Sequence, residues 1–185
     1  MKMKRVILFW QKVHFNVYRF HLFFSEKIIG YPFDLLLNNK FLVNLYKKRG
    51  VENPAFLVRK ATTRPDIGPV NWKTDGTMIL LISLIVFSFL NIITAIAGYM
   101  IWADWSFLIF FLLTGIPSVF INYFLLWKND IYLTYFKLFE KEPKPELKKW
   151  AWISFITVIL IIVLLVFSFY IMTSNMAPSI DLDKK

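Results

Sequence analysis

The side chains that could perform acid–base or metal chemistry are few, because the chain has no cysteine and only two histidines. His14 and His21 are seven residues apart, so on a helix they would share a face but lie about 10 Å apart along its axis. One metal ion prefers ligands one helical turn apart, so this pair does not predict a metal site. Contact with a membrane interface or with a partner protein is the preferred interpretation of both histidines.

The carboxylates do not form a recognisable acid–base pair either. Asp66, Asp75 and Asp130 are the only candidates for an enzyme that would act on a lipophilic substrate near the inner side of a membrane. The glutamates between residues 140 and 146 alternate with lysine and proline, which is typical of a solvated linker. The six glycines do not form a phosphate-binding loop. We therefore predict no catalytic, cofactor-binding or metal-binding residue, and a protein that is not an enzyme.

Long apolar runs dominate the rest of the chain, in which 57% of the 185 residues are hydrophobic. Soluble proteins contain about 45–50% apolar residues, and a helix needs about 20 of them to cross a bilayer. Residues 78–101, 107–127 and 150–172 meet this length and contain no Asp, Glu, Lys, Arg or His. The expected fold is an all-α integral membrane protein with three transmembrane helices, the first two forming a hairpin.

The positive charges predict the orientation of these spans. Residues 1–77 contain 14 basic and 5 acidic residues, and the charged linker 128–149 contains 6 and 4, whereas the turn 102–106 has no basic residue. Basic segments stay on the cytoplasmic side, so the N-terminus is expected inside and the short tail 173–185 outside. Tryptophans near the span ends agree with this arrangement. A bacterial cytoplasmic membrane is favoured over an organelle inner membrane.

The region before the first span is expected to contain two helices, at about residues 4–29 and 34–49, followed by a loop over residues 50–77. The first of these has a basic, aromatic and amphipathic character. Its apolar stripe could lie in the membrane interface or pack on a partner protein. The stripe consists of Val6, Trp10, Val13, Val17, Phe20 and Phe24.

Small and polar residues recur inside the apolar runs, at spacings that place them along one side of each helix. Such residues allow helices to approach closely and to form hydrogen bonds, so we predict that they pack the spans together. Lining of a pore in a self-assembled oligomer is the alternative. The predicted packing residues are Ser83, Asn91, Thr94, Gly98, Thr114, Gly115, Ser118, Asn122, Ser154, Thr157 and Ser168.

These observations favour a small non-catalytic subunit that scaffolds or stabilises a larger membrane complex. The expected partners are other integral membrane subunits and anionic lipid headgroups on the inner side. The formal charge of +10 needs no nucleic acid to explain it, because orientation and anionic lipid account for it. No small-molecule substrate is indicated. The alternative is a homo-oligomeric pore, transport or immunity-type membrane protein.

Overall fold

A computed structural model describes residues 2–30, 34, 36–66, 68–99, 101–102 and 105–176. Within these residues the chain is helical and contains no strand. The chain divides into two units: unit 1 comprises Met1–Met78 and Leu125–Ser154, and unit 2 comprises Ile79–Phe124 and Phe155–Lys185. The elements are α1 (Lys2–Phe24), the π-helix η1 (Ser25–Gly30), α3 (Lys40–Lys47), α4 (Pro54–Thr62), α5 (Pro69–Ala97), α6 (Phe107–Asn122), the π-helix η2 (Tyr123–Trp127), the 3-10 turn η3 (Lys128–Asp130), α7 (Ile131–Phe139) and α8 (Lys144–Met176).

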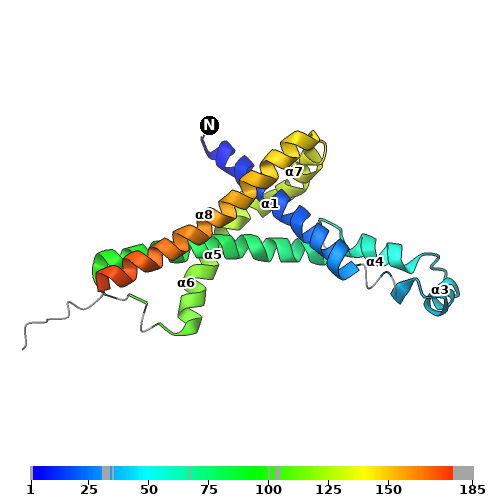
Figure 1. The fold of residues 1–185 in the computed structure, drawn as a ribbon, viewed down its shortest axis with the longest axis horizontal. Helices are drawn as coiled ribbons and strands as arrows, with labels where there is room; N and C mark the ends of the chain where they lie inside the picture. The colour runs from blue at the N-terminus through cyan, green and yellow to red at the C-terminus, as the bar shows by residue number, and fades with distance from the viewer. Residues whose placement is uncertain are drawn as a thin grey trace, which may run out of the picture. The chain divides into compact units, whose positions relative to one another are not determined.

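Unit 1 is organised around α1, which packs against α7 (Figure 1). The side chains of its aromatic core come from α1, the start of α5 and α7. Because α7 presents its aromatic residues one helical turn apart, they form a continuous apolar face. The core residues are Phe15, Tyr18, Val70, Tyr132, Phe136 and Phe139.

Two short helices connect α1 to α5 within unit 1. α3 begins after Asn39, whose side chain accepts a hydrogen bond from the amide of Phe41. α4 begins at Pro54, where the preceding Asn53 accepts a hydrogen bond from the amide of Phe56. An Asn N-cap followed by proline is a favourable helix start, which explains why α4 forms in the segment expected to be a loop. Between α4 and α5, the described residues of the predicted loop that are not helical are residues 63–66 and Gly68.

The segment expected to be a charged linker also contains structure. Residues 131–139 form α7, whose buried residues Tyr132, Phe136 and Phe139 belong to the core of unit 1. The chain enters α7 through Asn129 and Asp130, both of which have positive φ angles of 58° and 52°. Two consecutive left-handed residues end the preceding helix and change the direction of the chain.

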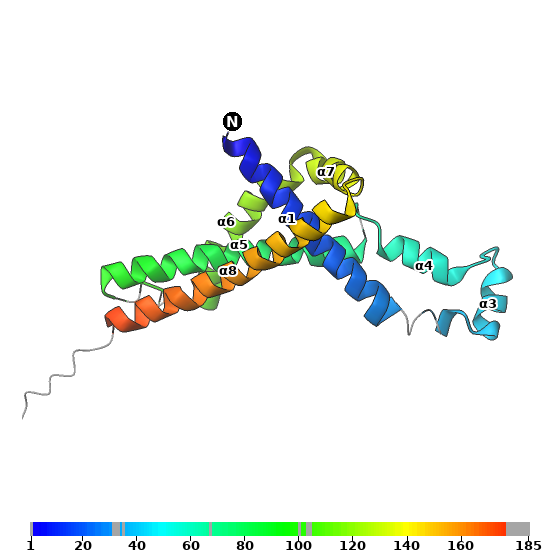
Figure 2. The same cartoon turned by 45° about the horizontal axis from the view of Figure 1, so that its top comes forward.

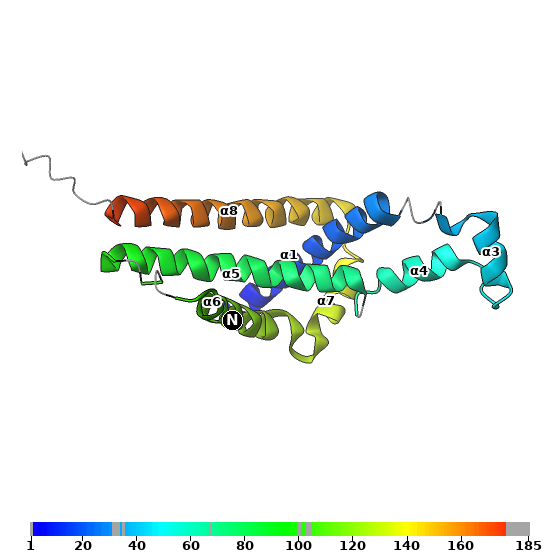
Figure 3. The ribbon, with the colours of Figure 1, turned by 90° about the horizontal axis from the view of Figure 1, so that it is seen from below.

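Unit 2 consists of α6 and the parts of α5 and α8 that lie beyond unit 1. Its parts of α5 and α8 run in the same direction (Figures 2 and 3). Phe87 packs edge-on against Phe110 of α6 and Phe169 of α8, with ring centroids 4.9 and 5.4 Å away. Two hydrogen bonds accompany this contact: Ser83 to Ser118 and Asn91 to Ser168. Unit 2 therefore combines aromatic packing with polar contacts between helices.

Three helical stretches are long and apolar enough to cross a membrane, namely Pro69–Ala97, Leu108–Phe139 and Lys144–Asn175. This confirms the prediction of three such stretches and is compatible with an integral membrane protein. The first and third begin before the predicted residues 78 and 150, because their polar flanks continue the same helices. The second contains the break at Asn129 and Asp130, so its predicted part 107–127 corresponds to α6 and η2. α8 accounts for the predicted tail as far as Met176, and residues 177–185 lie outside the described residues.

Candidate functional site

The carboxylate of Asp75 in α5 is the centre of a polar cluster in unit 1. Its Oδ1 atom lies 3.1 Å from Nε2 of His14 and accepts a hydrogen bond of 2.9 Å from the indole Nε1 of Trp127. Its Oδ2 atom accepts a hydrogen bond of 3.0 Å from the side-chain amide of Asn71. We call these four residues the Asp75 cluster. It connects α1, α5 and η2 through a single carboxylate.

His14 is fully buried within this cluster. Because an ionised carboxylate only accepts hydrogen bonds, Nε2 of His14 carries the hydrogen. The ring lies 5.6 Å from that of Tyr132 and 5.1 Å from that of Phe136, centroid to centroid. A histidine oriented by an aspartate is also found in catalytic triads, where its second nitrogen faces a nucleophile. Here Nδ1 has no hydrogen-bond partner among the described residues, and the buried ring is positioned to hold α1 on α5.

Gln11 connects α1 to η2 on the neighbouring turn of the helix. Its side-chain amide donates to the backbone carbonyls of Leu125 and Leu126 at 2.8 and 3.3 Å. The π-helical turn changes the regular pattern of helical hydrogen bonds, so carbonyls there can accept from a side chain. Gln11 is fully buried, which makes this a contact of the protein interior.

Lys12 is held between a carboxylate and two aromatic rings. Its Nζ atom lies 2.8 Å from Oε1 and 3.1 Å from Oε2 of Glu142. The same ammonium lies 4.5 Å from the ring centroid of Trp150 and 5.1 Å from that of Phe139. An ammonium over aromatic faces gains a favourable electrostatic interaction, which increases as water is excluded. This arrangement attaches α1 to the segment that starts α8.

Two further polar contacts lie along the second half of α1. The hydroxyl of Tyr18 donates to the carbonyl of Thr63 at 2.6 Å, and burial raises the pKa of Tyr18 to about 12. Nε2 of His21 lies 2.9 Å from Oγ1 of Thr77, and burial together with the positive charge of Lys73 lowers the pKa of His21. Both side chains are therefore expected to be neutral at neutral pH.

The predicted apolar stripe of α1 is divided between the interior and the surface of unit 1. Trp10, Val13 and Val17 are buried by the protein itself. Val6, Phe20 and Phe24 are exposed, at the two ends of the same helix. The middle of the stripe is thus covered by the chain's own helices, and only its ends could face lipid or a partner protein.

Most of the predicted packing residues of the spans are buried side chains. The fully buried Asn91 donates to Ser168 at 3.2 Å, and Ser83 donates to Ser118 at 2.9 Å. Other hydroxyl and amide groups donate to carbonyls of their own helix, as Ser154 does to Trp150. The buried members are Asn91, Thr94, Thr114, Ser118, Asn122, Ser154 and Ser168, while Ser83, Gly115 and Thr157 are half-buried.

Gly98 differs from the predicted packing role. It is exposed and follows the last residue of α5 with a positive φ of 73°, and its amide donates to the carbonyl of Thr94. Glycine adopts this left-handed conformation without the steric cost of a side chain, so Gly98 ends the helix. Gly50 has the same conformation after α3, with a φ of 78°.

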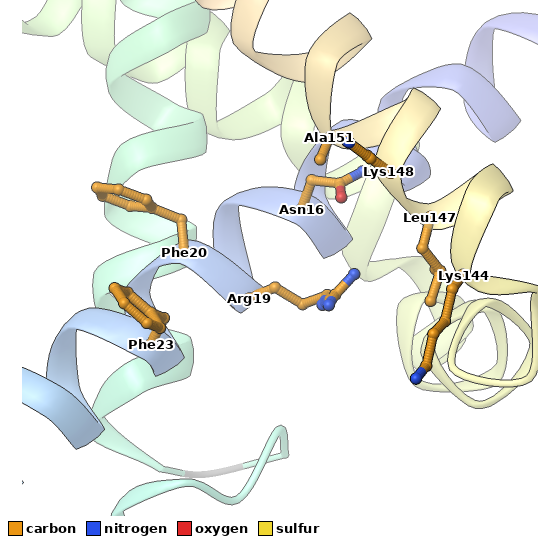
Figure 4. A pocket seen from close by; sticks show the side chains of 8 residues that line it. All are labelled: Asn16, Arg19, Phe20, Phe23, Lys144, Leu147, Lys148 and Ala151. Carbon is orange, nitrogen blue, oxygen red and sulfur yellow. The ribbon is translucent and has the colours of Figure 1, made fainter.

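An open groove of about 570 Å³ lies between α1 and α8 in unit 1 (Figure 4). The rings of Phe20 and Phe23 lie on its α1 side, and the side chain of Arg19 extends from α1 toward α8. Lys144 and Lys148 project from α8, one helical turn apart. The groove is lined by Asn16, Arg19, Phe20, Phe23, Lys144, Leu147, Lys148 and Ala151.

No family model, curated protein or solved structure matches this chain. Across the part of the chain that the structure describes, no three His, Cys, Asp or Glu side chains are grouped so that they could hold a metal ion.

Sequence reasoning did not predict the Asp75 cluster or the Lys12–Glu142 pair, because both depend on contacts between distant segments. It considered Asp75 only as a candidate catalytic residue, and His14 as a residue in contact with a membrane interface or a partner protein. The spacing of Tyr132, Phe136 and Phe139 was a usable signal for α7, since it repeats every helical turn.

Proposed function

We propose that this chain is a non-catalytic integral membrane subunit that scaffolds or stabilises a larger membrane complex. Unit 1 is the platform on the cytoplasmic or matrix side, and the three spans anchor it. The N-terminus lies inside and the C-terminus outside, as the distribution of basic residues favours. The use of polar side chains in unit 1 supports this role: Asp75, His14 and Lys12 connect helices to one another.

The observation that carries the proposal is the exposure of apolar side chains on α3 and α4, outside the three candidate spans. Phe41 is 72% exposed and Phe56 58% exposed, and the adjacent Leu57 and Val58 are also exposed. Phe56, Leu57 and Val58 are consecutive in α4, and neighbouring exposed apolar residues are typical of an interaction surface. A membrane subunit that binds a partner protein through this surface explains why it is apolar. We call Phe41, Phe56, Leu57 and Val58 the arm surface.

The inward position of the polar span residues supports packing rather than a pore. Asn91, Thr114, Ser118 and Asn122 are all buried within unit 2 of a single chain. Side chains that line a water-filled path through an oligomer would instead face outward from each chain. The scaffold function is therefore the one that the geometry favours.

The test is purification of the full chain from its native membrane in a mild detergent. The proposal expects one or more other proteins to co-purify in fixed stoichiometry with the wild type. Phe56→Asp combined with Leu57→Asp should release them and keep the helical content of the chain. Ala61→Ser, an exposed position on the same helix, is the matched control and should keep them.

Two results would overturn the proposal. One is a wild-type chain that purifies as a stable monomer without another protein. The other is a chain that conducts ions when reconstituted alone in liposomes, which would place it in the pore class. Retention of the partner by the variant with Phe56→Asp and Leu57→Asp would show that the arm surface is not the contact.

A further inference from the structure

The groove between α1 and α8 in unit 1 combines positive charge with apolar surface. Arg19, Lys144 and Lys148 supply three cations, and the residues that line the groove include no carboxylate. Across the described residues, none of these three cations forms an ion pair. An anionic group is therefore the occupant that complements the charge of the groove.

The same groove has an apolar wall. Phe20 is 64% exposed and Phe23 60% exposed, and Leu147 and Ala151 line the groove from α8. A free phosphate or another small anion would leave these rings in contact with water. A ligand with a charged head and a hydrocarbon part satisfies both the cations and the rings.

The position of the groove along α8 indicates which amphiphile this is. Lys144 and Lys148 lie just before residue 150, after which the described part of α8 contains no charged residue. The point where a spanning helix changes from charged to apolar lies at the level of the lipid headgroups, and basic residues there attract anionic lipids. Trp150 and Trp152 also follow at this point, as interfacial tryptophans do.

We propose that this groove binds one anionic phospholipid, with the headgroup phosphate held by Arg19, Lys144 and Lys148. The glycerol and upper acyl region pack on Phe20 and Phe23. The phosphate bridges α1 and α8, because its cations come from both helices (Figure 4). This goes beyond the scaffold function, because it concerns the isolated chain and needs no partner protein.

The experiment titrates the purified full chain in a neutral detergent with short-chain phosphatidylglycerol and follows binding by native mass spectrometry. Phosphatidylcholine of the same chain length and inorganic phosphate are titrated in parallel. We expect phosphatidylglycerol to bind at least about tenfold more tightly than either, since only it supplies both a net negative headgroup and acyl chains. Replacing all three cations, as Arg19→Gln, Lys144→Gln and Lys148→Gln, should weaken its binding about a hundredfold.

A matched triple variant separates the groove from the general charge of the protein. Lys47→Gln, Lys137→Gln and Lys141→Gln remove the same charge from exposed positions outside the groove and should leave binding unchanged. A separate variant with Phe20→Ser and Phe23→Ser should weaken phosphatidylglycerol but not the small affinity for inorganic phosphate. Variants are compared only where circular dichroism shows wild-type helical content.

Several outcomes would overturn the lipid site. Equal binding of the two phospholipids would show that charge is not recognised, and equal weakening by the control triple variant would show a general charge effect. Phosphate binding as tight as that of phosphatidylglycerol would indicate a free anion. Tighter binding of an acidic peptide, added as a fourth ligand, would indicate a protein ligand. None of these results depends on whether the arm surface binds a partner.

Discussion

Nε2 of His14 in α1 and Oδ1 of Asp75 in α5 lie 3.1 Å apart, although 61 residues separate them in the sequence. The histidine is fully buried, and Trp127 and Asn71 donate to the same carboxylate. The helix α1 is thereby joined to α5, the helix that is the first candidate span. Because buried hydrogen-bonded groups are costly to leave unpaired, this contact makes the stability of unit 1 sensitive to single substitutions.

The first prediction concerns the shared carboxylate. Asp75→Asn keeps the shape of the side chain, but the amide nitrogen that it introduces can only donate hydrogen bonds. This nitrogen would therefore face at least one of the three donors that the carboxylate binds in the wild type, which belong to His14, Trp127 and Asn71. We expect the free energy of unfolding to fall by about 1–3 kcal/mol. Thermal unfolding in detergent, followed by circular dichroism, measures the change. Asp66→Asn, at an exposed position, is the control; an equal loss in both variants would contradict a special role for the cluster.

The second prediction concerns the coupling between Lys12 and Glu142. Lys12→Met, Glu142→Gln and the double variant form a thermodynamic cycle. With side chains only 10% and 24% exposed, the pair should show a coupling energy of about 0.5–3 kcal/mol. The pair Lys149 and Glu146, 3.7 Å apart and 64% and 41% exposed, is the control and should show almost none. Equal coupling in both cycles would argue against the aromatic enclosure of Lys12.

The third prediction concerns the pH dependence that His21 contributes. Its pKa is lowered from the ordinary 6.5 by burial and by Lys73, so the folded protein disfavours the charged ring. The contribution of His21 to stability is therefore fully present above pH 6.5, the ordinary pKa of histidine, and is lost as the pH falls through the lowered pKa of the folded protein. Melting temperatures of the wild type and His21→Gln, measured at about pH 5 and about pH 7.5, should differ more at the higher pH. His14 is present in both proteins, so its own effect cancels; a constant difference would contradict the prediction.

The fourth prediction concerns the hydrogen bond between α5 and α8 in unit 2. Ser168→Ala removes the hydroxyl that accepts from the buried amide of Asn91. Hydrogen bonds between transmembrane helices contribute about 0.6–2 kcal/mol, and we expect a loss of that size in unfolding by sodium dodecyl sulfate. Thr173→Ala, at an exposed position of α8, should cause no measurable loss. If Ser168→Ala behaves like Thr173→Ala, the contact does not stabilise the spans.

The fifth prediction concerns orientation, and the absence of native cysteine makes it simple to test. Lys4→Cys and Ser174→Cys each introduce a single thiol near one end of the described chain. In intact cells, a membrane-impermeant maleimide should label the variant at position 174 and should label the one at position 4 only after permeabilisation. Labelling of both positions from the same side would refute three crossings.

The number of apolar spans was predictable because length and the absence of charge determine it locally. The apolar residues 107–127 form α6 and η2, and the second candidate span continues beyond them to Phe139. The contacts of Lys12 and His14 were not predictable, because polar residues on an amphipathic helix are usually solvated. The burial of Lys12 and His14 depends on α7. The helical spacing of the aromatic residues in α7 is a sequence signal for this helix, but the charged residues around it are typical of a solvated linker. α4 forms in the segment expected to be a loop, because Asn53 provides an N-cap and Pro54 is favourable at the first position of a helix.

The side-chain contacts of α1 also have a consequence for biosynthesis. Gln11 bonds to carbonyls 114 and 115 residues later, and Lys12 pairs with a carboxylate 130 residues later. A ribosome therefore has to add about 130 further residues before α1 can find these partners. Until then its aromatic residues remain uncovered, and uncovered apolar surface on a nascent chain is prone to aggregate.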